Sequence, residues 1–291
     1  MSADTLPSHY IKIHNHGFVG LVDHMGSDGA IVEAARVSYQ KGTVATREDR
    51  ALIRYLMRHR HTSPFEMAEV KLHVRAPIFV IRQWIRHRTA AVNEESGRYS
   101  EIREEFFTPA LGDIGPQSRD NKQGRTGGYT TKQQAAVQEI IEANNDFAYG
   151  QYRGLLAQDL ARELARVVLP LTAYSSFYWK IDLHNLFHFL ALRTDSHAQK
   201  EIRDYADAIL EIIEPLFPYS VEAWRDYVQE AVTLSRMDLD LLKSMLSLSN
   251  AKMKWIDMVE GHRGEKVLAE KFGMSGRELR DFVNRFDLPS F

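Results

Sequence analysis

The stretch RQWIRHRTAAVNEESGRYS, residues 82–100, holds the side chains of this sequence that are best suited to bind a polar ligand. Guanidinium groups pair with phosphate oxygens or ring carbonyls at fixed geometry, and nearby carboxylate and hydroxyl groups complete the hydrogen bonds of such a ligand. Cations also stabilise the C-terminal end of a helix, but that effect accounts for only one or two of these charges. A site for a ligand with a phosphate and a carbonyl-rich ring, and a solvated loop, are therefore equal alternatives from these residues alone. The side chains concerned are Arg86, His87, Arg88, Asn93, Glu94, Ser96 and Arg98.

The spacing of these residues resembles the signature of the flavin-dependent thymidylate synthase family. Its longer form, RHR-x4-NE-x-S-x-R, is matched at every fixed position between Arg86 and Arg98. Further blocks resemble the family in the same order, so that the similarity spans about residues 10–220. Ala91 stands where many members carry a serine, and a hydroxyl contact is missing there. The further blocks are AARVSY at residues 34–39, HTSPFE at 61–66, ARVVLP at 165–170 and LRTDSHAQ at 192–199.

The resemblance implies an enzyme that converts dUMP to dTMP by reductive methylation. Methylenetetrahydrofolate would be the carbon donor, FAD reduced by NADPH would be the hydride source, and tetrahydrofolate would be released. The other thymidylate synthase family attacks the pyrimidine with a cysteine thiolate, a route closed to a chain that has no cysteine. The resemblance also implies a homotetramer that holds FAD and dUMP between its subunits.

One set of residues is implied by the resemblance to bind dUMP. Arg98 and Arg166 are the candidates for the phosphate, and Gly97 would let the backbone approach the nucleotide closely. Arg166 lies in the apolar context ARVVLPL, where a buried arginine needs an anion, so Glu163 one turn earlier is the alternative partner. The residues implied are Gln83, Trp84, Ile85, Arg86, Glu94, Glu95, Ser96, Gly97, Arg98, Arg166 and Arg193.

Arg193 is the residue to which we assign catalysis. By similarity it lies beside the O2/N3 edge of the uracil, where a fixed guanidinium would favour the N3-deprotonated form of the ring. Electron density would then move toward C5, the carbon to be alkylated, and the ring would be activated without a covalent protein adduct. Ser96 has no evident general base beside it in the sequence, so we assign it to binding.

A second set of residues is implied to contact FAD. The three residues of the RHR triplet would touch the cofactor, and Glu94 would lie where the flavin and the nucleotide meet. Asparagines can occupy the places of Asp182 and His188 in the family. The residues implied are Ser38, His61, Ser63, Arg86, His87, Arg88, Glu94, Asp182, Leu183, His184 and His188.

A zinc site is an alternative at two of these positions. His184 and His188 are four residues apart on a predicted helix, a spacing that can bind zinc. The glutamate that follows the first histidine of a zinc-protease HExxH motif is absent, because Asn185 stands there. A zinc-dependent hydrolase is therefore one alternative, and ordinary helix histidines are another.

Hydrophobic periodicity predicts the elements that position these side chains. The fold expected is α/β or α+β, with a mixed sheet flanked by long helices and a polar, glycine-rich loop at residues 112–128. A helix beginning at Pro77 buries Ile78, Ile81, Trp84 and Ile85, so the charged stretch begins at the end of that helix. Asp182 is a suitable N-cap for a later helix. Strands are predicted at residues 11–22, 67–75 and 173–180, and further helices at 30–38, 47–59, 131–168, 183–192 and 195–217.

The 291 residues suit a catalytic domain over residues 1–231 and a helical C-terminal accessory region over 232–291. The segment Gly264–Phe286 resembles a helix-turn-helix, so a nucleic-acid-binding protein is a further alternative. Acidic neighbours offset the cations of that segment, and a net charge of −2 gives no general attraction to nucleic acid. The N-terminal sequence lacks a signal-peptide pattern and no apolar run reaches the ~18 residues of a membrane span, which favours a cytoplasmic protein.

Overall fold

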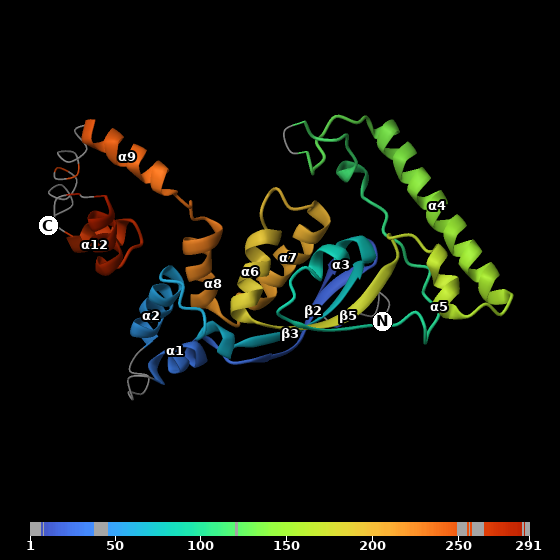
Figure 1. Ribbon diagram of the computed structural model, residues 1–291, viewed down its shortest axis with the longest axis horizontal. Coiled ribbons are helices and arrows are strands. Elements are labelled where there is room, and N and C mark those ends of the chain that lie inside the picture. Colours follow the sequence, from blue (N-terminus) through green and yellow to red (C-terminus); the bar gives the residue numbers. More distant parts are fainter. Residues whose placement is uncertain are drawn as a thin grey trace. The chain divides into compact units, whose positions relative to one another are not determined.

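The computed structural model describes residues 7, 9–37, 46–119, 122–248, 255, 257, 265–286 and 288. The chain divides into two compact units, Met1–Gln229 and Glu230–Phe291. A five-stranded sheet lies in the first unit (Figure 1), with the strand order β1-β2-β3-β5-β4. The strands are β1 (Tyr10–Ile13), β2 (Gly17–Met25), β3 (Glu69–Pro77), β4 (Ala91–Glu94) and β5 (Tyr174–Asp182).

Every strand pairing in this sheet is antiparallel. The expectation of a mixed sheet is therefore wrong, and the fold is α+β. Periodicity shows where a strand lies but not which neighbour it pairs with, since long connections allow either direction. Here β3 and β5 pair along their whole length, from Glu69 opposite Asp182 to Pro77 opposite Tyr174.

The first predicted strand is a hairpin rather than one continuous strand. β1 and β2 are joined by a turn over residues 14–16, where His14 adopts a left-handed φ of 54°. Gly17 follows because a Cβ there would lie 2.1 Å from the Tyr205 hydroxyl and 2.5 Å from the Ile13 carbonyl oxygen. The turn explains why the hydrophobic alternation of this run is weak.

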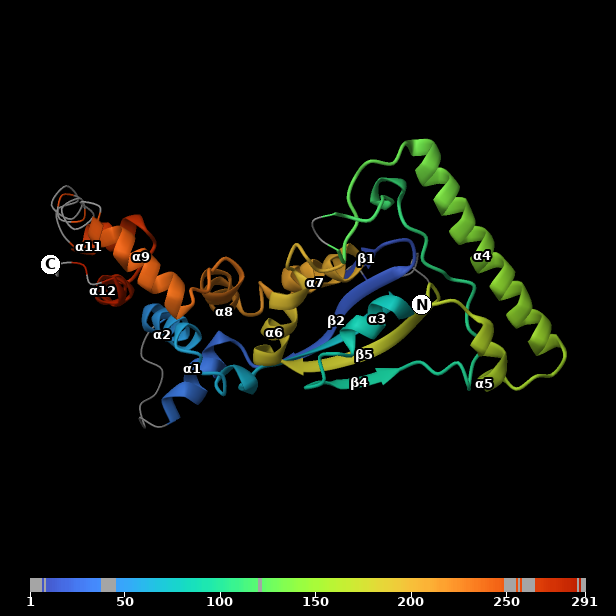
Figure 2. The same cartoon turned by 45° about the horizontal axis from the view of Figure 1, so that its top comes forward.

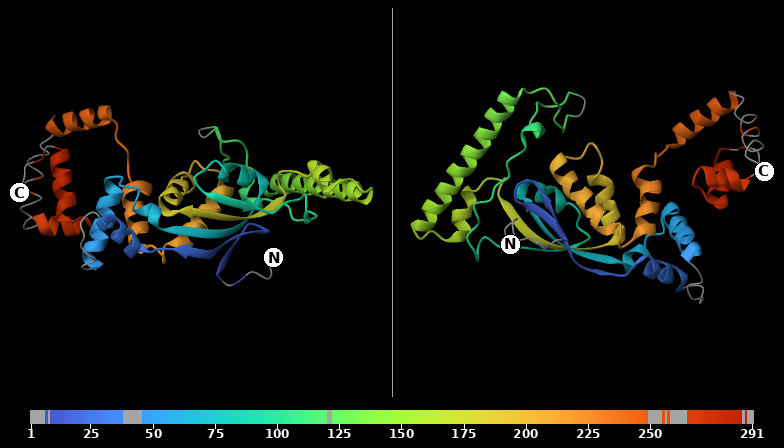
Figure 3. Two further views of the ribbon diagram at one scale, coloured as in Figure 1. Left: turned by 60° about the horizontal axis from the view of Figure 1, so that its bottom comes forward. Right: turned by 180° about the vertical axis from the view of Figure 1, so that it is seen from behind.

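Helices cover one face of the sheet (Figures 2 and 3). Alternate residues of the central strands, such as Leu72 and Val74 on β3 and Trp179 on β5, are fully buried in a common core with α3, α6 and α7. The helices of the first unit are α1 (Asp28–Arg36), α2 (Thr46–Arg58), α3 (Ile78–Trp84), α4 (Thr131–Ala157), α5 (Arg162–Ala165), α6 (Leu183–Arg193), α7 (Lys200–Ile213) and α8 (Pro218–Trp224). Shorter helical turns are Phe65–Met67, Leu111–Asp113, Arg166–Val168 and Arg225–Gln229.

Trp84 at the end of α3 fixes that helix against the sheet and α6. Its ring centroid lies 5.2 Å from that of Trp179 and 5.0 Å from that of Phe189. Asp182 is confirmed as the N-cap of α6, since it accepts from the Asn185 backbone N–H at 2.9 Å. The ends of α3 and α6 are therefore held close together.

Several predicted boundaries are wrong. Ile85 was expected to be buried but is 41% exposed, because α3 ends one residue before it. The helix predicted to reach residue 168 ends at Ala157, after which Asp159 has a left-handed φ of 63°. The helix predicted from residue 195 begins at Lys200. β4 was not predicted, because all its residues are exposed at the edge of the sheet and show no apolar alternation.

The second unit contains α9 (Arg236–Leu248), α11 (Glu265–Lys271) and α12 (Gly276–Arg285). Leu268 and Ala269 of α11 pack with Leu279 and Val283 of α12 in a small core of their own. Gly273, between the two helices, has a φ of 65°, the left-handed conformation that glycine adopts without strain. The predicted helix–turn–helix pattern is thus present. Among the described residues, no helix is long and apolar enough to cross a membrane.

A buried carboxylate joins α1 to α8. Asp28 accepts from the Tyr219 N–H at 2.7 Å and from the Ser220 N–H and hydroxyl at 3.1 and 2.6 Å. We expect Asp28→Ala to lower the free energy of unfolding by about 1–3 kcal/mol, because it leaves these buried donors without an acceptor. Asp23→Ala is the control, since the Asp23 side chain is 69% exposed, and should change stability by less than ~0.5 kcal/mol. Urea unfolding measures both, and equal effects of the two substitutions would contradict the assignment.

Candidate functional site

A pocket of about 270 Å³ lies where the residues after α3 meet α6. Five residues that the sequence predicted for ligand binding line it, and they come from segments about a hundred residues apart. Four further residues line the pocket and were missed, because their types and positions are those of ordinary loop, strand or helix residues. They are Thr89, Ile181, Asn185 and Leu192. The predicted residues that line it are Arg86, His87, Arg88, His188 and Arg193.

Arg193 is held in this pocket by two hydrogen bonds. Its Nε donates to His87 Nε2 at 3.1 Å, and its Nη2 donates to the Gln83 carbonyl oxygen at 3.3 Å. A guanidinium has five N–H donors, so others remain for a ligand. These two bonds fix the orientation of the Arg193 guanidinium, and its remaining N–H groups are left for a ligand in the pocket.

His87 accepts from Arg193 because it is neutral. Burial lowers the pKa of His87 to about 4, with further lowering from the charge of Arg193 and from His188. The pKa of Arg193 is also lowered by burial, but a guanidinium stays protonated in proteins. With Nε2 as the acceptor, the His87 proton lies on Nδ1. His87 and Arg193 thus form an acceptor–donor pair rather than two repelling cations, even below the usual histidine pKa of about 6.5.

Arg86 and Arg88 supply positive charge to the pocket, and no described carboxylate pairs with either of them. Both are exposed, and neither forms an ion pair within the described part of the chain. Unpaired guanidinium groups beside a pocket suit a ligand with phosphate or carbonyl oxygens. A dinucleotide such as FAD carries both, so these residues fit that cofactor.

The other predicted arginines form a separate cluster beyond the end of β4. Arg98 pairs with Glu163 at 3.0 Å, and both side chains are more than half exposed. A Cβ on Gly97 would lie 3.3 Å from Cδ of Arg166. The glycine therefore lets the Arg166 side chain lie close to the backbone at residue 97. The apolar context of Arg166 predicted a buried side chain, with Glu163 as the alternative partner to a ligand, and the expectation of burial is wrong. Arg166 is exposed, and the buried residue beside it is Ala165, the last residue of α5.

The two glutamates before this cluster are tied to β5. Glu94 accepts from the Ser175 hydroxyl at 2.6 Å, and Glu95 accepts from the Ser176 N–H at 2.9 Å. Ser96 accepts from the Arg98 N–H at 3.3 Å, as in a turn. None of the hydrogen bonds or ion pairs of these described residues reaches the Arg193 pocket. One chain by itself therefore presents two cationic clusters and not a single site.

The remaining predicted residues differ in what they offer a ligand. His61 and Ser63 are exposed in the loop after α2. The Leu183 side chain and that of Trp84 are buried in the core, so only their main-chain atoms are left for binding. Both carboxylate oxygens of Asp182 accept from Asn185. Ser38 lies outside the described residues. Within the described ranges, no group of three or more His, Cys, Asp or Glu side chains could hold a metal.

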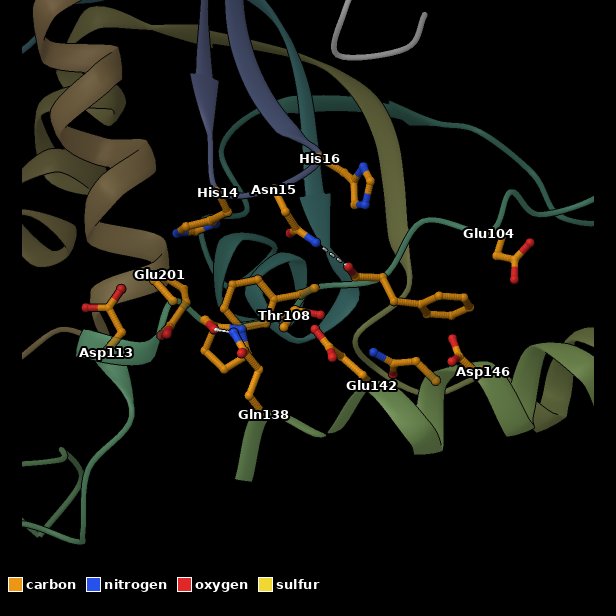
Figure 4. Close-up of a pocket in the computed structure, with 15 residues that line it drawn as sticks. His14, Asn15, His16, Glu104, Thr108, Asp113, Gln138, Glu142, Asp146 and Glu201 are labelled. Carbon is orange, nitrogen blue, oxygen red and sulfur yellow. Dashed lines mark hydrogen bonds between the residues drawn. The ribbon is translucent and has the colours of Figure 1, made fainter. Parts of the chain in front are cut away.

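A second pocket, of about 600 Å³, lies between the β1–β2 turn, the segment before α4, and α4 itself (Figure 4). It contains none of the predicted binding residues. Carboxylates dominate its charged groups, and they would repel a phosphate. The smaller cationic pocket is therefore the better candidate for a nucleotide or a dinucleotide cofactor. The acidic side chains here are Glu104, Asp113, Glu142, Asp146 and Glu201.

Comparison with known proteins agrees with the motif. Residues 20–219 match the family model described as thymidylate synthase complementing protein. The flavin-dependent thymidylate synthase of Ruegeria pomeroyi is 46% identical over 95% of this chain and 89% of its own length. That of Thermus thermophilus is 54% identical over 81% of this chain and 86% of its own.

This chain belongs to the flavin-dependent thymidylate synthase family. The resemblance inferred from the RHR motif is thus confirmed. Among solved structures, the UMP/dUMP methylase PolB of Streptomyces cacaoi bound with 5-Br UMP superposes with a TM-score of 0.68 and 37% identity. The match covers 75% of this chain and 98% of PolB. The same protein bound with 5-Br dUMP matches equally well, with a TM-score of 0.68.

The pairing of Arg193 with neutral His87 can be tested by titration. Between pH 5 and 8 we expect the His87 ring to remain uncharged, since its pKa is about 4. Arg193→Ala removes a nearby positive charge and should raise the pKa of His87, whereas Arg82→Ala, on the exposed side of α3, should not. NMR of histidine labelled with 13C follows both. An unchanged His87 titration in Arg193→Ala would contradict the pairing.

Proposed function

We propose that this protein converts dUMP to dTMP, with methylenetetrahydrofolate as carbon donor and FAD reduced by NADPH as hydride source. The observation that carries this proposal is the Arg193 guanidinium, oriented by His87 and the Gln83 carbonyl oxygen in a cationic pocket. Family membership adds the reaction class. We also propose that residues 1–231 form the catalytic domain, that 232–291 are accessory, and that the enzyme acts in the cytoplasm.

Arg193 would act on the uracil ring. A fixed guanidinium at the O2/N3 edge stabilises negative charge there, and N3 deprotonation directs electron density toward C5. The ring then becomes nucleophilic at the carbon that receives the methylene group. This chain has no cysteine to add to C6, so polarisation by charge takes the place of covalent activation.

The RHR triplet and His188 would hold FAD at the pocket. When bound, the flavin supplies the hydride that converts the transferred carbon to a methyl group. The two free arginines would neutralise its phosphate charge, and neutral His87 would offer Nδ1–H as a donor. His188 and Asn185 line the same wall from α6, where they suit the polar edge of the cofactor. Ser38, His61 and Ser63 are retained as proposed contacts from more distant segments.

The dUMP phosphate would bind at the second cluster. An exposed ion pair such as Arg98–Glu163 is worth only about 0–1 kcal/mol, so a phosphate can replace the glutamate at little cost. Gly97 lets the side chains of Ile102 and Arg166 lie close to its backbone, and Ser96 adds a hydroxyl. Glu94 and Glu95 would position this segment through their contacts with β5.

Because the two clusters lie apart in one chain, we propose that a complete site joins clusters from different subunits. The homotetramer implied by the family would supply such pairs. Each phosphate-binding cluster would then close the Arg193 pocket of a neighbouring subunit. For the nucleic-acid-binding alternative, the net charge of −2 gives no general attraction to a phosphate backbone.

Loss of the Arg193 guanidinium should abolish most turnover without loss of cofactor. We expect Arg193→Ala to lower kcat by about 10²–10³-fold, the usual effect of removing a preorganised charge-stabilising group. Arg82→Ala is the matched control and should retain activity. The assay is dTMP formation, together with a visible flavin spectrum that NADPH bleaches and that methylenetetrahydrofolate plus dUMP restore. Near-normal turnover of Arg193→Ala, or stoichiometric zinc with no flavin spectrum, would refute the proposal.

Arg98 should serve dUMP rather than FAD. We expect Arg98→Ala to raise the Kd for dUMP by about 10–100-fold, as loss of a charge-assisted hydrogen bond does. Glu163→Gln removes the competing carboxylate and should leave dUMP affinity equal or tighter. Titration calorimetry with dUMP and flavin fluorescence for FAD separate the two ligands. A larger effect of Arg98→Ala on FAD than on dUMP would contradict the assignment.

A further inference from the structure

The outer face of α4 carries an apolar stripe whose residues are all exposed. Ile140 and Phe147 are 70% and 68% exposed, although large apolar side chains are normally buried. The opposite face of the helix packs on the rest of the first unit through Asn145, Ala148 and Tyr152. In the figures, all the other elements of this unit lie on one side of α4 (Figures 1 and 2). The stripe consists of Ala136, Ile140, Ala143, Phe147, Gly150 and Gly154.

These positions alternate at spacings of four and three residues. That is the 3.5-residue repeat by which one helix packs along another in a coiled coil. A solvated helix face has no reason to keep apolar residues in this register over the greater part of 27 residues. The spacing therefore indicates that another helix packs along this face.

Two glycines in the stripe give independent evidence of a partner. Each glycine inside a helix lowers its stability by about 0.5–1 kcal/mol relative to alanine. A Cβ at Gly150 or at Gly154 would meet no atom of the described residues within 4 Å, so neither glycine makes room for a neighbour in the part of the chain that the structure describes. Small residues at a helix surface permit close approach of another helix. We therefore expect Gly150 and Gly154 to contact a helix of another chain.

We propose that α4 of a second copy of this chain packs antiparallel on this stripe, with a two-fold axis near Asn145. In that register each large residue of one copy faces a small residue of the other, so that the surfaces interlock. A parallel pair would instead set Phe147 against Phe147 and glycine against glycine, leaving a clash and a gap. The antiparallel pairs are Ala143 with Phe147, Ile140 with Gly150, and Ala136 with Gly154.

Charges beside the stripe agree with this arrangement. Arg153 of one copy lies within one helical turn of Glu139 of the other, and the two-fold axis repeats the pair. Arg153 bonds to Glu101 of its own chain at 2.9 Å, but both side chains are about half exposed, so Arg153 can exchange or share partners at little cost. Asp146 faces its own copy near the axis, a repulsion between exposed charges that salt screens.

Introduced disulfides test the register directly, because the chain has no cysteine. Positions 140 and 150 are about 15 Å apart along one helix, too far to join within a chain. The double variant Ile140→Cys/Gly150→Cys should form covalent dimers under mild oxidation, while each single variant should not. Ala135→Cys/Glu142→Cys, about 100° around the helix, is the control and should stay uncrosslinked. Dimers from the single variants would show a parallel pair, and no dimers from the double variant would show no pair; either result overturns the proposal.

Assembly provides the second readout. Ile140→Glu should halve the molar mass measured by light scattering, whereas Ala135→Glu, which adds the same charge to an exposed position off the stripe, should leave it unchanged. Gly150→Leu fills the open space without adding charge and removes a helix glycine, so it should dissociate the pair while the separated chains stay folded by circular dichroism. Wild-type mass for both Ile140→Glu and Gly150→Leu would overturn the proposal, whatever the flavin content or activity of the variants.

Discussion

The burial of Trp84 between the sheet and α6 decides where the cationic pocket can form. Its ring lies within 5.0–5.8 Å of the rings of Phe177, Trp179, Phe189 and Tyr205, which come from β5, α6 and α7. Aromatic pairs of this kind add about 0.5–1.5 kcal/mol each beyond the area they bury. They keep the end of α3 against α6, so His87, three residues later, reaches Arg193. Within the described part of the chain, the buried indole N–H of Trp84 has no hydrogen-bond partner, so packing rather than hydrogen bonding holds this side chain.

The electrostatics of the pocket follow from that packing. A solvated His87, with the usual pKa of about 6.5, would be protonated in mildly acidic solution and would then repel Arg193. Burial keeps the imidazole of His87 uncharged and able to accept a hydrogen bond. His87 therefore orients the guanidinium of Arg193 without neutralising its charge. Arg193 thus keeps its charge, has a fixed plane and retains donors for a ligand. Preorganisation of this kind is what a site needs to stabilise charge that develops on a bound ring.

The sequence was most informative where a residue type has few alternative uses. The RHR motif, Arg193 and the Asp182 cap were predicted because their spacing or chemistry is specific, and the first two meet in one pocket. The antiparallel direction of the sheet was not predictable, because strand pairing depends on contacts between residues far apart in sequence. β4 was missed because an exposed edge strand has no apolar alternation, and Arg166 was misplaced because apolar residues beside it, such as Leu164 and Val167, are themselves exposed. The two cationic clusters could not be separated from sequence, since spacing along the chain carries no information on which residues a single subunit brings together.

The central claim is that Arg193 polarises the uracil without covalent attack, and the protonation state of bound dUMP at N3 tests it most directly. NMR of dUMP labelled with 15N at N3, bound to the oxidised flavoprotein near neutral pH, reports that state. The account predicts an N3 resonance shifted toward the deprotonated form with the native protein, and a resonance close to that of free dUMP with Arg193→Ala. The same N3 resonance for native protein, Arg193→Ala and free nucleotide, with binding saturated in both proteins, would contradict it.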